Sequence, residues 1–241
     1  MNMFRSQLRQ ELVVMARNGE QLLLLIGIPI LLLIFFSQVD VLPTQGLSAV
    51  AFLVPGILAL AVISSAMVSL GIATGFERSY GVLRRLGTTP LGTPRLVFAK
   101  VVATCLVESA QLMLLVVAGL ALGWRPVDVD WLIVLVAILL GTTCFAGIGL
   151  TLAGRLRAEV NLAAQNGLYL LLLLLGGIIV PNEELPPAAR SFAGWLPSSA
   201  LSEILRNSFS SRDLVFENLV VLVVWSLAMC STAVLFFRWS D

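Results

Sequence analysis

The chain has 241 residues, of which 59% are hydrophobic and only 12% are charged, and its mean hydropathy is +0.98. Soluble proteins carry about 25% charged residues, so this composition excludes a soluble globular domain and predicts an all-α integral membrane protein. The net charge of +1 is close to neutral, so the positions of the arginines carry more information than their sum.

Residues 1–19 are predicted to form an amphipathic helix that lies along the cytoplasmic interface. Apolar side chains recur there at helical spacing, at Phe4, Leu8, Leu12 and Met15. The other side of the helix carries the charged residues Arg5, Arg9, Glu11 and Arg17. A basic amphipathic segment directly before a span is typical of an interfacial helix. An ordinary cytoplasmic tail is the alternative.

Six apolar stretches are each predicted to cross the membrane as a helix, since about 20 residues span a hydrocarbon core about 30 Å thick. They cover residues 21–37, 47–75, 96–122, 131–154, 160–180 and 214–237. No small-residue cleavage site follows the first stretch, so we expect it to remain as a span rather than be removed as a signal peptide. The second stretch is rich in glycine, serine and alanine, which predicts close packing on another helix.

The loop between the second and third spans is the longest basic interruption in the first half of the chain. Residues 77–86 are predicted to form about three helical turns, with Tyr80, Leu83 and Leu86 on one apolar edge. Gly87 suits a C-terminal cap, and the prolines that follow prevent the helix from continuing. A membrane-surface helix whose arginines contact anionic headgroups is the alternative.

The third span carries two ionisable residues. Lys100 lies near its cytoplasmic end, where its long side chain is expected to reach the interface. Glu108 lies well inside the span, where a carboxylate costs about 2.5 to 3.5 kcal/mol on insertion scales, so it should face protein, a cavity or a partner. Two interpretations stay open. Glu108 contacts a cationic substrate or holds a subunit interface, or it is a hydrogen-bonded packing residue with Gln111 as the nearest candidate partner.

The distribution of lysine and arginine predicts the orientation. The six spans place eleven of these residues on one side and four on the other, which indicates that the first side, with both termini, is cytoplasmic. Residues 123–130 are predicted to form a short external turn, with Trp124 and Trp131 at the membrane interface. The polar start of the fifth span is expected to be its inner, partly wet end, with Glu159, Asn161, Gln165 and Asn166.

Residues 181–213 are too apolar for a solvated loop and contain too many prolines to cross the membrane as one helix. We expect one or two short re-entrant helices held against protein, because bare loop backbone is not exposed to lipid. The first is predicted to start after Pro186 and Pro187. The second is predicted to start at Ser198 or Ser199, acting as the N-cap. A covering loop without a gating role is the alternative.

Three groups of residues carry a family resemblance: Pro55-Gly56-Ile57-Leu58; Glu77-Arg78, Gly81, Arg84-Arg85 and Thr89-Pro90; and Leu185-Pro186, Trp195-Leu196-Pro197 and Glu203 to Arg206. With these motifs and its order of short spans, the chain resembles the permease subunits of ABC-2 type exporters over nearly its whole length. The resemblance implies an elbow helix at residues 1–19, a cytoplasmic coupling helix at residues 77–86 and an external re-entrant lid at residues 181–213.

The same resemblance implies roles for individual residues. The residues that couple to a separate ATPase would be Glu77, Arg78, Tyr80, Gly81, Leu83, Arg84 and Arg85. The external gate would include Pro186, Trp195, Pro197, Glu203 and Arg206.

The chain lacks the motifs of an enzyme. It has no Gly-x-x-x-x-Gly-Lys-[Ser/Thr] loop for ATP phosphates, and Lys100 is its only lysine. Histidine is absent, and Cys105, Cys144 and Cys230 each lie in an apolar run, so they are expected to be core residues. We therefore predict no catalytic residue, no metal site and no cofactor bound by this chain.

We interpret the chain as the permease of an ATP-driven exporter in the cytoplasmic membrane. The resemblance implies a second permease copy, identical or not, and cytoplasmic ATPase subunits that hold ATP and Mg²⁺. Apolar walls favour a lipophilic substrate such as a drug, antibiotic or lipid, lying between the two permeases and lined by the second and fifth spans. No nucleic acid is expected as a partner. A gradient-driven carrier and a non-transporting assembly subunit are the alternatives.

Overall fold

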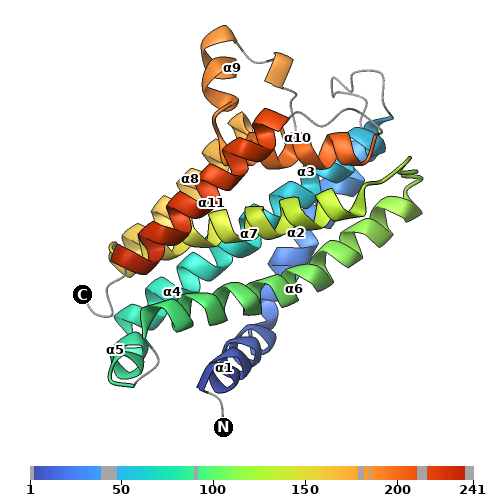
Figure 1. Cartoon of the computed structure of the whole chain (residues 1–241). Coiled ribbons are helices and arrows are strands. Elements are labelled where there is room, and N and C mark those ends of the chain that lie inside the picture. The colour runs from blue at the N-terminus through green and yellow to red at the C-terminus, as the bar shows by residue number, and fades with distance from the viewer. Residues whose placement is uncertain are drawn as a thin grey trace.

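The computed structural model describes residues 3–38, 48–89, 92–178, 182–184, 186–210 and 216–236, and these ranges are built almost entirely from helices (Figure 1). In chain order the elements are α1 (Met3–Arg17), α2 (Gly19–Gln38), α3 (Ala49–Ile63), the π-helical turn η1 (Ser64–Ser69), α4 (Leu70–Ser79), α5 (Val82–Gly87), α6 (Thr93–Ala121), α7 (Trp131–Ala153), α8 (Ala158–Leu175), the 3-10 turn η2 (Asn182–Glu184), α9 (Pro187–Ala193), α10 (Pro197–Ser208) and α11 (Phe216–Phe236). The prediction of an all-α chain is confirmed.

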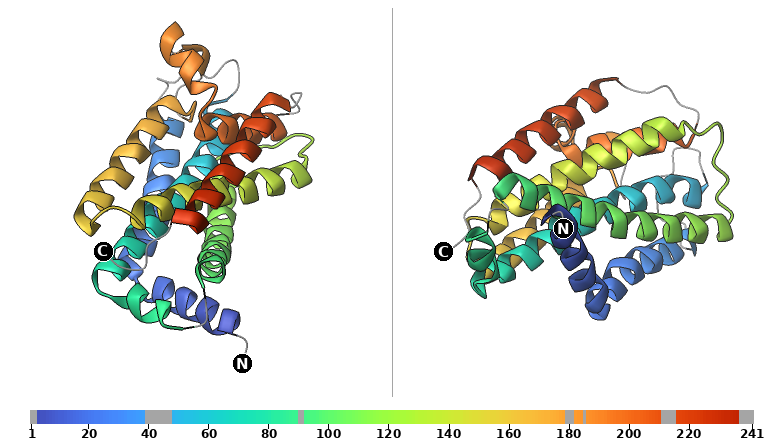
Figure 2. Two further views of the ribbon diagram at one scale, coloured as in Figure 1. Left: turned by 60° about the vertical axis from the view of Figure 1, so that its left-hand side comes forward. Right: turned by 60° about the horizontal axis from the view of Figure 1, so that its bottom comes forward.

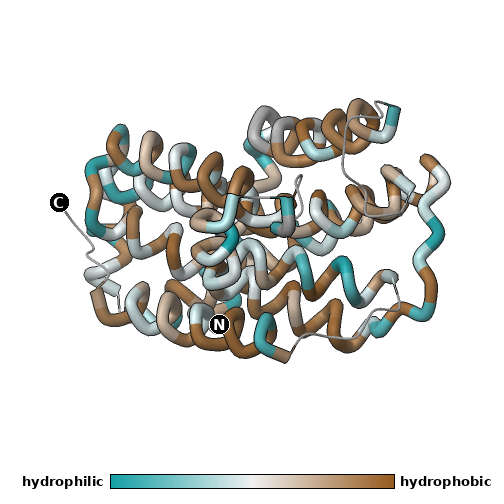
Figure 3. The backbone as a smooth tube through the Cα atoms, turned by 90° about the horizontal axis from the view of Figure 1, so that it is seen from above, coloured by the Kyte–Doolittle hydropathy of each residue, from teal (hydrophilic) through white to brown (hydrophobic). Residues whose placement is uncertain are grey.

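Five helices among the described residues are long and apolar enough to cross a membrane, and Figure 3 shows hydrophobic residues along their length. They are Ala49–Ser79, Thr93–Ala121, Trp131–Ala153, Ala158–Leu175 and Phe216–Phe236. These helices correspond to the second to sixth predicted spans. The first predicted span lies within α2, whose described apolar stretch, Leu25–Gln38, is shorter than the other five. Five spans are therefore supported, and six remains a prediction.

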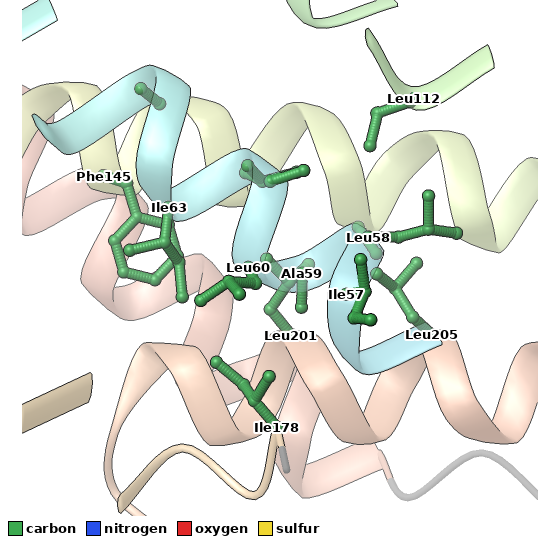
Figure 4. Packing of buried hydrophobic residues seen from close by; sticks show 14 of the residues in the cluster. Ile57, Leu58, Ala59, Leu60, Ile63, Leu112, Phe145, Ile178, Leu201 and Leu205 are labelled. Atoms are coloured by element: carbon green, nitrogen blue, oxygen red, sulfur yellow. The ribbon is translucent and has the colours of Figure 1, made fainter. Parts of the chain in front are cut away.

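The centre of the bundle is α3. Every side chain from Phe52 to Ile63 is buried, and the neighbours that enclose this helix come from α2, α6, α7 and α10. Figure 4 shows Ile57, Leu58 and Leu60 packed near Leu201 and Leu205 of α10. The second span is therefore held by protein on nearly all sides of its first half.

Glycines allow the second span to approach its neighbours closely, as its content of small residues predicted. A Cβ atom added at Gly56 would clash with the backbone carbonyl of Ile178, at 2.4 Å. A Cβ atom added at Gly149 of α7 would lie 2.6 Å from the carbonyl oxygen of Met67 in η1. In both cases the neighbouring atom belongs to the backbone, so no change of side-chain rotamer could make room for the added Cβ atom. Backbone-to-backbone packing of this kind is typical of helices in membranes.

The two ends of the bundle differ. One end, called here the basic end, holds α1, α5 and the turn between α7 and α8, and the other end carries α9 (Figures 1 and 2). At the basic end the guanidinium of Arg155 lies over the Phe236 ring at 4.8 Å, so the last described helix also finishes there. At the opposite end the α6–α7 turn meets α10, where Trp124 packs edge-on against Phe209. Trp124 is almost fully buried inside the protein at this end, and its position at the membrane interface stays a prediction.

The second and fifth spans depart from their predicted bounds at one end each. The fifth was predicted to run over residues 160–180, but α8 ends at Leu175, and Gly177 then adopts a φ of +63° that a glycine tolerates at little cost. Residues 179 and 180 lie outside the described ranges. The second span continues to Ser79 through η1, beyond the predicted end at residue 75.

The proline-rich segment forms two short helices. α9 begins at Pro187, as predicted, and most of its side chains are exposed. α10 begins at Pro197 with Leu196 as its N-cap, so the prediction of a serine cap was wrong. Ser198 and Ser199 are instead buried in the first turn of α10. The reason is that proline, with its fixed φ and no N–H, suits the first helical position, so the helix starts two or three residues earlier than predicted.

Candidate functional site

The basic loop after the second span contains two helices rather than one. The prediction of a continuous helix over residues 77–86 was wrong, because α4 ends at Ser79 and α5 begins at Val82. Gly81, between them, has a φ of +72°, a left-handed conformation that is accessible to glycine and unfavourable for other residues. The chain therefore turns at Gly81, and α5 has its own direction.

The seven residues expected to contact an ATPase separate into buried and exposed groups. Leu83 is fully buried against Leu96 and holds α5 to the start of α6. Arg84 and Arg85 are exposed on α5. The Tyr80 side chain is 75% exposed, and its ring stacks on Phe76 with centroids 5.9 Å apart. Glu77 and Arg78 turn into the protein, so they are not part of the outward surface of the loop.

Lys100 forms a buried cluster with two carboxylates, which we call the Lys100 triad. Its Nζ lies 2.7 Å from Oε2 of Glu77 and 3.0 Å from Oε2 of Glu11, and the lysine side chain is 1% exposed. Gln7 donates a hydrogen bond to the other oxygen of Glu11, at 2.7 Å. The triad joins α1, α4 and α6, so the expectation that Lys100 extends to the interface was wrong. Glu11, placed on the polar face from the sequence, is also buried.

Arg78 anchors the end of α4 to the end of α7. Its Nη1 donates to the carbonyl oxygens of Ala153, at 2.9 Å, and Leu156, at 3.3 Å. These carbonyls lie at the C-terminus of a helix, where the last carbonyl groups have no partner inside the helix and a cation is favoured. Arg78 therefore joins two spans directly behind the turn that carries α5.

Glu108 is hydrogen-bonded within the bundle. Its carboxylate lies 2.9 Å from Oγ of Ser65 in η1 and 2.7 Å from Oγ1 of Thr142 in α7, and the residue is 1% exposed. Gln111, the partner expected from the sequence, donates instead to the carbonyl oxygen of Leu25 at 2.8 Å. Of the two interpretations left open, the geometry matches the hydrogen-bonded packing residue.

We predict that Glu108→Gln changes the free energy of unfolding by no more than about 1 kcal/mol, because an amide keeps an acceptor and Ser65 and Thr142 also reach carbonyls of their own helices. Unfolding by a detergent titration measures this, with Glu159→Gln, an exposed change of the same chemistry, as the control. Binding of neutral and cationic compounds should change equally. A loss confined to cations would place Glu108 on a substrate pathway.

A groove of about 760 Å³ runs beside the second span. Its walls come from α1, α2, η1, α4 and α8, and its lining residues are Val14, Asn18, Leu25, Ile28, Pro29, Ser64, Val68, Ser69, Ile72, Ala73, Phe76, Glu77, Tyr80, Leu162, Asn166 and Tyr169. This volume is within the range of about 300–1,000 Å³ found for small-molecule sites. Glu108 and Gln111 are not among the lining residues.

Two amides in α8 hold that helix against the second span and against α7. Asn161 donates to the carbonyl oxygen of Gly71 at 2.9 Å, and Gln165 donates to the carbonyl oxygen of Gly149 at 3.0 Å. Both side chains are fully buried, so these two residues do not face a wet surface, whereas Glu159 and Asn166 at the same end of α8 are exposed. The four-residue spacing of the two amides, opposite glycines, is the sequence signal that could have indicated a helix contact.

The residues expected to form an external gate lie at the end opposite the basic end. Arg206 is buried, donates to Oε1 of Glu203 at 2.9 Å and to the carbonyl oxygen of Gly177 at 2.8 Å, and stands over the Phe52 ring at 4.2 Å. Pro197 is also buried. Pro186 and Trp195 are exposed. The predicted set therefore divides into a buried anchor on α10 and an exposed part near α9.

Comparison with known proteins gives a consistent result. The family described as "ABC-2 type transporter" matches residues 3–210. A Bacillus subtilis (strain 168) protein named "Putative transport permease YvfS" is 26% identical over 235 residues, covering 94% of each chain. A Porphyra purpurea protein named "Putative transport permease ycf38" is 27% identical over 177 residues, covering 72% of this chain and 60% of its own length.

Proposed function

The chain belongs to the ABC-2 type transporter family, and from that premise we propose that it is the permease subunit of an ATP-driven exporter of a lipophilic small molecule. The family implies an ABC ATPase as a partner. In this proposal ATP and Mg²⁺ are held by the ATPase, and a second permease copy completes the transporter. The chain lies in the cytoplasmic membrane with its basic end and both termini inside.

The observation that carries the proposal is the construction of α5. This short helix has a buried anchor, Leu83, and two exposed cations, Arg84 and Arg85. It is separated from α4 by the turn at Gly81, and both flanking spans are fixed behind it by Arg78 and Lys100. A protein that binds α5 can therefore move the ends of two spans together.

The transport step follows from differential binding. An ATPase dimer that closes on ATP and contacts α5 better in one arrangement of the spans shifts the permease towards that arrangement. The groove beside the second span gives the substrate a place to bind, because its lining is mostly apolar and includes residues of the second and fifth spans together with α1 and α2. With a second copy facing the groove, the substrate lies between the two permeases.

The test is charge reversal on α5. The double change Arg84→Glu with Arg85→Glu should weaken binding of the cognate ATPase at least about tenfold, since two exposed cations that face a docked partner become repulsive. Binding is measured with purified subunits after gentle detergent extraction. Arg5→Glu with Arg9→Glu is the matched control, because it reverses two exposed arginines at the same end on α1. Equal loss in both double variants, or no loss on α5, would contradict the docking role.

A further inference from the structure

One end of the groove is negatively charged. Among the described residues that line the groove, Glu77 is the only one with a charged side chain. Its partner Lys100 lies behind it, 1% exposed, and divides its charge between Glu77 and Glu11. Two carboxylates and one ammonium give the Lys100 triad a formal charge of −1. A molecule in the groove therefore meets negative charge at this end.

Two aromatic residues line the groove together with this carboxylate. Phe76 and Tyr80 are on the same helix end as Glu77, and their rings are stacked with centroids 5.9 Å apart. The faces of aromatic rings attract organic cations, and an ammonium group beside a ring gains about 0.5–2 kcal/mol. A carboxylate and aromatic rings in the lining of one groove are thus suited to a substituted ammonium group.

The rest of the groove suits an apolar body. Leu25 and Ile28 of α2 face the groove together with Val68, Ile72 and Leu162. None of these side chains offers a hydrogen bond, so a long apolar group loses little by leaving the bilayer for this wall. The groove is therefore amphipathic along its length. Most of its wall is apolar, and the one charged side chain among its described lining residues, the carboxylate of Glu77, lies at the basic end of the bundle.

We propose that the groove selects amphiphilic organic cations, with the apolar body against α2, α4 and α8 and the cationic head at Glu77, Phe76 and Tyr80. This inference rests on the proposed function, in which the groove is the substrate pathway. Anionic amphiphiles of the same size are disfavoured, because none of the lining residues that the structure describes carries a positive charge.

The experiment measures equilibrium binding of three fluorescent probes to the full chain in nanodiscs of uncharged phosphatidylcholine. The probes share one dansyl-decyl body and end in a trimethylammonium, a hydroxyl or a sulfate group. We expect the ammonium probe to bind about tenfold more tightly than the hydroxyl probe, and the sulfate probe to bind most weakly. Ile72→Trp fills the groove and should weaken all three probes.

Variants that change a charge in the groove wall test whether that charge determines which probe binds best. Glu77→Gln should reduce the preference for the ammonium probe to about twofold or less, and it leaves Lys100 paired with Glu11. Glu159→Gln, an exposed change outside the groove, should leave the preference unchanged. Asn166→Lys adds a cation to the groove wall and should reverse the order of the ammonium and sulfate probes, with Asn166→Gln as its neutral control. The two Asn166 variants test the charge selection even if Glu77→Gln folds poorly.

Two contrary results are distinguishable. If the three probes bind equally to the wild-type chain, charge selection is overturned. The same holds if Glu77→Gln keeps the full preference for the ammonium probe and Asn166→Lys leaves the order of the probes unchanged. In both cases, as long as Ile72→Trp still blocks binding, the groove remains a binding site. If Ile72→Trp leaves all binding intact, the groove is not the site, and the pathway in the proposed function fails with it.

Discussion

Replacing Lys100 by methionine is expected to lower the free energy of unfolding by about 3–5 kcal/mol, the cost of breaking a buried ion pair by removing one partner. Lys100 is 1% exposed and lies 2.7 Å and 3.0 Å from two carboxylates. Without it, Glu77 and Glu11 face each other in a site with little water. Detergent titration of the purified chain measures the change, with loss of the contact between α1 and α6 as the structural consequence.

The matched control removes the charges together. In the triple variant Lys100→Met, Glu11→Gln and Glu77→Gln no uncompensated charge remains, and neutral replacement of a buried ionic group is often tolerated. We expect the triple variant to regain most of the stability that the single change removes. If both variants lose the same stability, packing of the lysine stem rather than its charge holds the three helices together.

Replacing Arg206 by methionine is expected to cost about 2–4 kcal/mol, because two hydrogen bonds of a charged donor and a cation–π contact are lost together. The guanidinium joins α10 to the Gly177 carbonyl after α8 and to Phe52 at the start of α3. The methionine side chain fills a similar space, so the loss is mainly of polar contacts. Beyond global stability, hydrogen exchange of α10 backbone amides should increase more than that of α7.

Glu203 supplies the comparison for this prediction. Its side chain is 22% exposed, so solvent weakens its pairing with Arg206, and Glu203→Gln should cost under about 1 kcal/mol. If Glu203→Gln costs as much stability as Arg206→Met, the ion pair, rather than the Gly177 and Phe52 contacts, fixes α10.

The spans could be predicted from the sequence because their signal is local. Long apolar runs mark five helices of the structure, and glycine-rich stretches correctly indicated close packing. The break at Gly81 was missed for a local reason as well. Tyr80, Leu83 and Leu86 have helical spacing, but one residue with a positive φ lies between them, and periodicity does not distinguish a continuous helix from two helices with a turn.

The polar partners could not be predicted, because they depend on contacts between distant parts of the chain. Glu108 is hydrogen-bonded to a residue 43 positions away, and Lys100 contacts Glu11 89 positions away. The sequence alone predicted a partner for Glu108 on its own helix and predicted that the Lys100 side chain reaches the membrane interface. Both predictions use only residues that are near in the chain. The insertion cost of a charge correctly predicted that Glu108 is enclosed by protein, but the partner follows only from the fold.

The π-helical turn at Ser64–Ser69 sets the angular phase between the two halves of the second span. A turn with one additional residue rotates everything after it by about 100° relative to an uninterrupted α-helix. Before this turn, α3 is enclosed by the core. After it, Ile72 and Phe76 look into the groove while Gly71 and Gly75 form the seam with α8. Without that offset Ile72 and Phe76 would face α8 in place of Gly71 and Gly75, and the close contact between the second span and α8 would be lost.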